Sequence, residues 1–226
     1  YGGLGRYEEA IDLIESALEV LTTESDLDNE DNISKIVECY NSLIVLYADM
    51  GNPKEGIALG SDTFEYIGRL GEEKNRDGSM AITYNNLAYA SQKLLDVASA
   101  ITFFEKTLEL YDKIYEGYPD HIQYASIYNN LGMTYLLMSD GKKAIEYLDK
   151  ALVIFEKAYE STSPLVAKIY GNIGQAYLLL GDTQKAFLNT KTCLDMYREL
   201  YGEDGGNADV SIAYGNMGLI LNTMGQ

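Results

Sequence analysis

From Tyr128 to Tyr135 the sequence reads Tyr-Asn-Asn-Leu-Gly-Met-Thr-Tyr, and altered copies of this stretch recur along the chain. The copies are Tyr-Asn-Ser-Leu at Tyr40, Tyr-Asn-Asn-Leu at Tyr84, Tyr-Gly-Asn-Ile-Gly at Tyr170 and Tyr-Gly-Asn-Met-Gly at Tyr214. Their first tyrosines lie 44, 44, 42 and 44 residues apart. A fixed period of roughly 20 to 50 residues is the sequence signature of a repeat array. The chain is therefore predicted to consist of repeats that bury their apolar surfaces against their neighbours.

The segments around these copies have the spacing of amphipathic helices. In residues 6–21, apolar side chains recur three and four positions apart, as at Ala10, Ile14, Ala17 and Leu21, which is typical of a helix with one buried face. Glycine and proline punctuate the segments, as in Gly51-Asn52-Pro53, because glycine can cap one helix and proline can begin the next. The turn at residues 93–96 has no glycine. Ten helices are predicted, over residues 6–21, 33–50, 53–70, 80–94, 97–115, 122–138, 142–159, 164–180, 183–201 and 209–224.

Small residues at fixed positions indicate how these helices pair. The second helix of each pair has one small residue fourteen positions after the asparagine triplet and another small or medium residue seven positions later. The first set is Ala10, Gly56, Ala100, Ala144 and Ala186, and the second is Ala17, Thr63, Thr107, Ala151 and Cys193. Small side chains let two helices approach closely. The array is therefore predicted to be a stack of helical hairpins joined by short turns.

The pattern of Tyr128, Leu131, Gly132, Tyr135 and Gly141, followed by Ala144 and Ala151, resembles the tetratricopeptide repeat. Tyrosine replaces the family's first tryptophan, and the period exceeds the common length of about 34 residues. The paired asparagines and the segment 163–167 are similar to the longer kinesin light chain type. The resemblance implies an all-α solenoid of antiparallel hairpins that forms a right-handed superhelix.

We expect a single array over residues 1–226. Residues 1–24 would be the second helix of a truncated repeat, and residues 206–226 would be the first helix of another. Full repeats are expected at 30–72, 77–117, 119–160 and 163–202. A chain that begins at Tyr1, halfway through a repeat, is expected to be a fragment.

The charge of the chain argues against two classes of partner. Asp and Glu number 35 against 17 Lys and Arg, which gives a formal net charge of -18. Such a field repels nucleic-acid phosphates and anionic lipid, and it favours basic partners. The acidic segment from Glu24 to Asp31 has two interpretations, a solvated loop or a site for a basic peptide. Apolar runs such as 135–138 are too short to span a membrane.

No constellation in the sequence indicates catalysis, a metal or a cofactor. Cys39 and Cys193 lie far apart and lack metal or redox spacing, so we expect free thiols in a reducing compartment, and hence the cytoplasm. His121 is the only histidine and lies in a predicted turn without an accompanying nucleophile. No glycine-rich phosphate loop is present. The chain is therefore expected not to be an enzyme.

A ladder of asparagines is the candidate binding site. Because a helix turns about 100° per residue, Leu131 and Tyr135 fall on the packed side, whereas Asn129, Asn130 and Met133 fall on the opposite side. In tetratricopeptide proteins this opposite side lines a concave groove. Primary amides suit the N–H and C=O groups of an extended peptide. The candidate peptide-binding residues are Asn41, Asn85, Asn86, Tyr89, Lys93, Asn129, Asn130, Met133, Lys168, Asn172, Gln175 and Asn216.

The ladder also has a structural interpretation. Each asparagine could instead bond a neighbouring helix and tie the stack together, and the two roles can coexist. Leu137 and Leu179 on the same side could form an apolar wall or pack against the next helix. Positive charge there is limited to Lys93 and Lys168, which are too far apart to clamp a terminal carboxylate.

Three functions remain open from the sequence. The first is a non-catalytic module that binds a protein or peptide segment in the concave groove. This segment could contain basic residues. The second is the ligand-sensing arm of a larger bacterial regulator or enzyme, which requires an effector domain outside residues 1–226. The third is a scaffold that associates with itself through its truncated ends.

Overall fold

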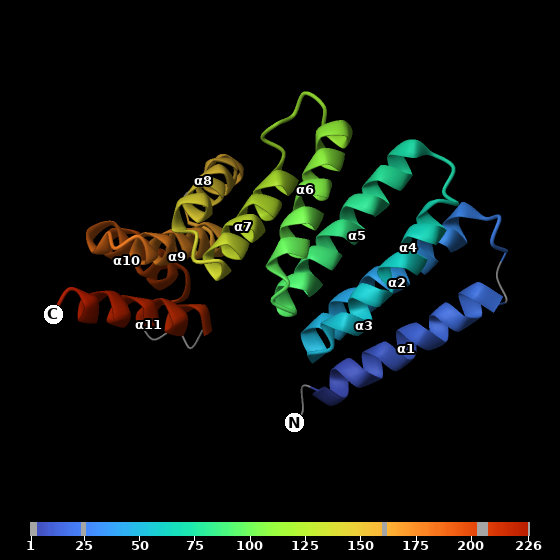
Figure 1. Ribbon diagram of the computed structural model, residues 1–226, viewed down its shortest axis with the longest axis horizontal. Helices are drawn as coiled ribbons and strands as arrows, with labels where there is room; N and C mark the ends of the chain where they lie inside the picture. The colour runs from blue at the N-terminus through green and yellow to red at the C-terminus, as the bar shows by residue number, and fades with distance from the viewer. Residues whose placement is uncertain (1–3, 24–25, 160–161, 203–207, 226) are drawn as a thin grey trace. The chain divides into compact units, whose positions relative to one another are not determined.

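The computed structural model describes residues 4–23, 26–159, 162–202 and 208–225, and in these ranges the chain consists of helices and turns without strands (Figure 1). This confirms the all-α solenoid. Glu24 of the acidic segment lies outside the described residues. The helices are α1 (Leu4–Thr23), α2 (Glu30–Met50), α3 (Pro53–Ala58), α4 (Gly60–Ile67), α5 (Glu73–Lys93), α6 (Val97–Ile114), α7 (Ile122–Leu137), α8 (Gly141–Ala158), α9 (Pro164–Leu179), α10 (Thr183–Tyr201) and α11 (Ala208–Thr223).

The helix predicted at 53–70 is divided in two. It is interrupted at Leu59, which keeps right-handed helical dihedral angles of φ -70° and ψ -13°, so that α3 and α4 together occupy the place of one second helix. Gly60 follows the interruption, and a Cβ there would lie 3.1 Å from both methyl groups of Leu87 on α5. Glycine at this position therefore lets α5 pack closely against the interrupted helix.

Helix α5 begins at Glu73, seven residues before the predicted start at 80. Its first turns are polar, so the apolar period does not reveal them. Two hydrogen bonds hold them in place, because Nη1 of Arg76 donates to the carbonyl oxygens of Leu70 and Gly71 at 2.7 and 2.8 Å. A side chain that satisfies the carbonyls of the preceding loop thus extends the helix beyond its apolar part.

The turns before α6, α8 and α10 share one construction, which the turn between α2 and α3 lacks because Asn52 makes no side-chain cap there. Asp96, Asp140 and Asp182 precede α6, α8 and α10, and each accepts a hydrogen bond from the backbone N–H three residues ahead at 3.0 to 3.2 Å. Gly181 adopts a left-handed conformation with φ of 78° before the last of these caps. In the turn without glycine, Leu95 takes the same conformation with φ of 62°. The aspartate cap therefore fixes the turn even where glycine is missing.

The chain divides into two compact units between Gly117 and Tyr118. Unit 1 contains α1 to α6 and unit 2 contains α7 to α11. The single array and its right-handed superhelix stay predictions, since each unit is described by itself. In the described part of either unit, no helix combines the length and the apolar character that crossing a membrane requires.

The small residues predicted at the hairpin contacts are buried from α3 to α10, whereas Ala10 of α1 is half-buried and Ala17 is exposed. Ala100, Ala144 and Ala186 each have 0% exposure. A Cβ built on Gly132 of α7 would lie 2.5 Å from Cγ of Leu148 on α8, which is closer than such atoms can pack. The hairpins therefore depend on residues without bulky side chains, as the sequence predicts.

Candidate functional site

A groove of unit 1 runs between α2 and α5. It has a volume of about 1060 Å³, and its lining includes Asn41, Ser42 and Val45 of α2 together with Ile82 and Asn86 of α5. Glu38 and Lys74 also line it and contribute one charge of each sign. Helices α2 and α5 are each the first helix of a hairpin. The groove lies on the side of these helices on which the sequence places the asparagine ladder. Its walls offer amide groups and apolar surface, the two features that an extended peptide needs.

Asn41 and Asn86 form a direct contact at this groove. Nδ2 of Asn86 donates to Oδ1 of Asn41 at 3.2 Å and also lies 3.4 Å from the backbone oxygen of Asn41. The bond joins the first helices of consecutive hairpins, as the structural interpretation of the ladder predicts. Oδ1 of Asn86 and Nδ2 of Asn41 take no part in it. The pair therefore ties α2 to α5 and still has polar atoms outside the tie.

Tyr89 and Lys93 lie on the same helix but serve a different contact. The hydroxyl of Tyr89 donates to Oδ1 of Asp49 on α2, and Nζ of Lys93 lies 3.6 Å from the same oxygen. Nζ of Lys93 also sits 5.1 Å from the centre of the Tyr89 ring. Burial and the bond to Asp49 raise the pKa of Tyr89. Both predicted site residues thus act as a second tie between α2 and α5, and neither lines the 1060 Å³ groove.

The ladder repeats its tie in unit 2. Nδ2 of Asn172 on α9 donates to Oδ1 of Asn129 on α7 at 3.4 Å. Nδ2 of Asn129 lies 3.5 Å from Oδ1 of Asn130 and 3.9 Å from Sδ of Met133. Asn172 is 9% exposed. Its side chain therefore presents little surface to an extended peptide, and its bond to Asn129 joins consecutive hairpins.

Other predicted peptide-binding residues of unit 2 line two smaller grooves. One of about 180 Å³ lies between α7 and α9 and is lined by Asn129, Asn130 and Lys168, among others. The other, of about 400 Å³, lies between α9 and α11 and contains Gln175 and Asn216. Leucines dominate the lining of the second groove, and they include the half-exposed Leu179 and Leu219. The surface of unit 2 therefore changes from polar to apolar between α7 and α11.

Sequence reasoning missed several groove residues. Ile82 is 54% exposed and lines the groove of unit 1 with Lys74, Asn75 and Ile114. A signal for Ile82 was present, because it precedes Asn86 by four residues, the same offset at which Lys168 precedes Asn172. Lys74 and Asn75 carried no such signal, since they belong to the polar turns at the start of α5. Asn85, which was predicted, is half-buried and does not line this groove.

The residues weighed for chemistry have structural roles. Nδ1 of His121 accepts a hydrogen bond from the backbone N–H of Gln123 at 3.4 Å and caps α7. Cys39 and Cys193 are free thiols, and burial raises the pKa of Cys193 to about 12. Within the described residues, no three His, Cys, Asp or Glu side chains lie together so that they could hold a metal ion.

Comparisons with known proteins agree with this architecture. The chain resembles the crystal structure of BtubC (BKLC) from P. vanneervenii with a TM-score of 0.80 at 21% sequence identity, over 97% of this chain and 84% of that one. It also resembles TPR-like repeats assigned to a kinesin light chain of Podosopora anserina, with a TM-score of 0.66 at 17% identity, over 84% of this chain and 87% of that one. At such identities the likeness shows the fold alone. A search among curated protein sequences finds no match.

The family of the chain follows from a match of its sequence to a family model. The family model of the tetratricopeptide repeat matches residues 79–140 and 123–199, which together span more than half of the chain. These ranges contain the stretch at 128–135, the hairpin formed by α7 with α8, and the hairpin formed by α9 with α10 except for the last two residues of α10. The repeat motif, the helical hairpins and the family match agree, and the chain belongs to the tetratricopeptide repeat family.

Proposed function

We propose that this chain is a non-catalytic module that binds an extended segment of a partner protein in the groove between α2 and α5. Tetratricopeptide repeats generally mediate protein–protein interactions. The observation that carries the proposal is the groove of about 1060 Å³, in which the Asn41–Asn86 pair lies beside Val45 and Ile82. Amides can pair with the backbone of an extended segment while apolar walls accept its side chains.

Exposure of Ile82 supports this choice of groove. A β-branched apolar side chain that is 54% exposed on a helix gains from being covered, at about 25 cal/mol for each Å² of apolar surface removed from water. Glu38 and Lys74 give the groove charges of both signs, whereas the whole chain has a net charge of -18. Long-range attraction therefore favours a basic partner, and apolar contacts in the groove select the segment.

The grooves of unit 2 provide further candidate contacts for the same class of partner. Asn130 and Lys168 offer polar contacts between α7 and α9, and Leu179 and Leu219 offer apolar contacts between α9 and α11. We also propose a cytoplasmic location, which the two free thiols support.

Selection from a displayed library of random peptides tests the function. The purified chain is used as bait, and the affinities of the enriched peptides are measured by fluorescence anisotropy. An Ile82→Arg variant should weaken their binding by roughly tenfold or more, because it places a charge in the apolar wall of the groove. Leu95→Arg is the matched control, since Leu95 is 71% exposed and does not line the groove.

Two outcomes would refute the proposal. Peptides that bind wild type and Ile82→Arg equally well would place the binding surface elsewhere. A library that yields no peptide enriched over the bare support would remove the groove as a peptide site. Circular dichroism of both variants should match wild type, because the substituted side chains lie on the surface.

A further inference from the structure

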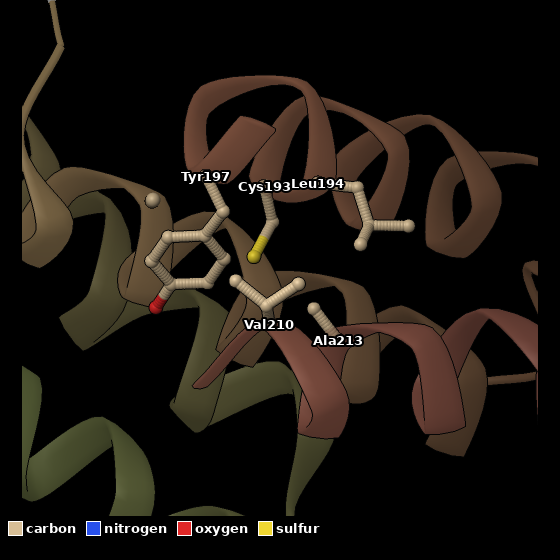
Figure 2. Close-up of a cluster of buried hydrophobic side chains, with 6 residues drawn as sticks. Cys193, Leu194, Tyr197, Val210 and Ala213 are labelled. Atoms are coloured by element: carbon tan, nitrogen blue, oxygen red, sulfur yellow. The ribbon is translucent and has the colours of Figure 1, made fainter. Parts of the chain in front are cut away.

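The apolar wall of the groove between α2 and α5 is open, in contrast to the apolar contact between α10 and α11. In that contact Val210 and Ala213 are each 3% exposed and pack with Cys193 (Figure 2). In the groove, Ile82 is 54% exposed and Val45 is half-buried. The groove therefore has apolar surface that a bound segment would cover.

The groove runs along the axes of its two helices. On α5 its lining follows one face of the helix through Lys74, Asn75, Gly78, Ser79, Ile82 and Asn86. From Lys74 to Asn86 a helix rises about 18 Å, which is the length of about five residues of an extended chain. A segment that fills the groove therefore lies parallel to α5 and reaches the first turns of that helix.

A second hollow begins where this groove ends. It has a volume of about 730 Å³ and lies between the first turns of α5 and the end of α6. Lys74 and Ile114 line both hollows, so the two share a border. Gly78 lies one helical turn from Lys74, and a Cβ on Gly78 would meet nothing within 4 Å. Packing within the described chain does not require glycine there, and its missing side chain leaves the border wide.

Carboxylates outnumber lysines in the second hollow. Its charged lining consists of Glu73, Lys74, Asp77, Asp112, Lys113 and Glu116. The end of α6 adds negative partial charge, because the last carbonyl groups of a helix have no partners within the helix. The lining of the first groove contains only one charge of each sign, from Glu38 and Lys74. The electrostatic preference for a cation is therefore concentrated in the second hollow.

We propose that the segment bound between α2 and α5 continues past Lys74 and places a basic side chain in this second hollow. The inference rests on the proposed function, because the same segment must occupy the groove. No three of the described acidic side chains are placed to share a metal ion, so the cation that fits is a side chain. Arginine suits the hollow better than lysine, since its planar fork can bind two carboxylates at once.

The helix register sets the spacing of the two anchoring side chains in the partner. Asp77 precedes Ile82 by five residues and Glu73 precedes it by nine, which correspond to about 7.5 and 13.5 Å along α5. An extended chain advances about 3.3 Å per residue. The basic residue should therefore lie two to four positions from the apolar residue that covers Ile82.

Selections from the displayed library with three baits test this spacing. The baits are wild type, Asp77→Asn/Glu116→Gln, which removes two charges from the second hollow, and the matched control Glu105→Gln/Glu109→Gln. The control removes the same charge from exposed positions of α6 that line neither hollow. Wild type and control should enrich peptides with a basic residue two to four positions from an apolar one. The Asp77→Asn/Glu116→Gln bait should enrich the apolar residue alone, which also shows that this variant is folded.

The affinity of one peptide enriched by wild type measures the contact directly. Fluorescence anisotropy compares this peptide with an analogue in which glutamine replaces the basic residue. Wild type and control should bind the analogue roughly fivefold or more weakly at 0.05 M sodium chloride, and 0.5 M salt should reduce the difference. Asp77→Asn/Glu116→Gln should bind the two peptides about equally.

The results separate a failure of this inference from a failure of the proposed function. Enriched peptides that lose affinity for Ile82→Arg but have no basic residue at the expected spacing would overturn the inference and leave the groove as the binding site. Equal effects in Asp77→Asn/Glu116→Gln and the control would also overturn it, because general attraction by the acidic chain would then explain the basic residue. A library without enriched peptides would remove the proposed function and this inference together.

Discussion

Two glycines at the same repeat position should respond in opposite directions to the same substitution. Gly132 of α7 and Gly218 of α11 both follow the ladder asparagine by two residues, and both belong to unit 2. A Cβ on Gly132 would meet Cγ of Leu148 at 2.5 Å and the backbone oxygen of Ala144 at 3.2 Å, whereas a Cβ on Gly218 would meet nothing within 4 Å. We predict that Gly132→Ala destabilises the unit and that Gly218→Ala stabilises it.

The magnitudes follow from two opposing effects. Alanine is better than glycine in a helix by about 1 kcal/mol, and both positions gain this term. Overpacking a core costs about 1–3 kcal/mol, and it applies only at Gly132. A cost in the upper part of that range is expected, because Leu148 has 0% exposure and the added Cβ would contact its Cγ, the branched carbon of the side chain. The net effect should be a loss of about 1–2 kcal/mol for Gly132→Ala and a gain of about 0.5–1 kcal/mol for Gly218→Ala.

Thermal unfolding followed by circular dichroism at low protein concentration measures both effects. At about 4–8 °C per kcal/mol for a domain of roughly 100 residues, the Tm of unit 2 should fall by roughly 4–16 °C in Gly132→Ala and rise by roughly 2–8 °C in Gly218→Ala. If both midpoints shift in the same direction, the reasoning is refuted, because the close contact at Gly132 would then not be the reason that this position requires glycine.

Two further predictions concern single side chains. Asn172→Ala should lower the free energy of unfolding by about 1 kcal/mol, because it removes the bond to Asn129 at 3.4 Å. Urea unfolding checks this against the exposed control Asn222→Ala, and equal losses in the two variants would contradict the tie. Burial raises the pKa of Cys193 from 9.0 and of Tyr111 from 10.0 to about 12 each, so the unfolded chain loses these protons first and stability should fall as pH rises above about 9. Urea midpoints at pH 8 and pH 10.5 measure the change, and a midpoint that does not fall would contradict it.

The helices that carry the repeat motif were predictable because their apolar faces repeat. Small residues such as Ala144 and Ala186 marked the hairpin contacts correctly, and both are fully buried. Prediction was weaker where polar contacts decide the outcome. The early start of α5 depends on Arg76 bonding the loop carbonyls, and a polar segment has no period from which that contact could be inferred.

For the candidate site, the sequence predicted which residues lie on the groove side of each first helix. It could not predict which partners their side chains would hydrogen-bond. Asn86 and Asn172 each bond an asparagine of the preceding hairpin, and Tyr89 and Lys93 both engage Asp49. These contacts span two hairpins, and a helical angle calculated within one helix contains no information about them. Ile82 was missed for a different reason, because the offset of four residues that singled out Lys168 was not applied to Asn86.

The amino-acid sequence by itself determined the tetratricopeptide family, the hairpin unit and the side of each first helix that stays away from its partner. These follow from local period and side-chain size, which act over one or two helical turns. Tertiary structure alone decided which asparagines tie the stack, where a groove opens and that Gly218 is uncovered while Gly132 is filled. The two glycines stand in nearly the same local sequence. Among the described residues, what distinguishes them is the second helix that packs against Gly132.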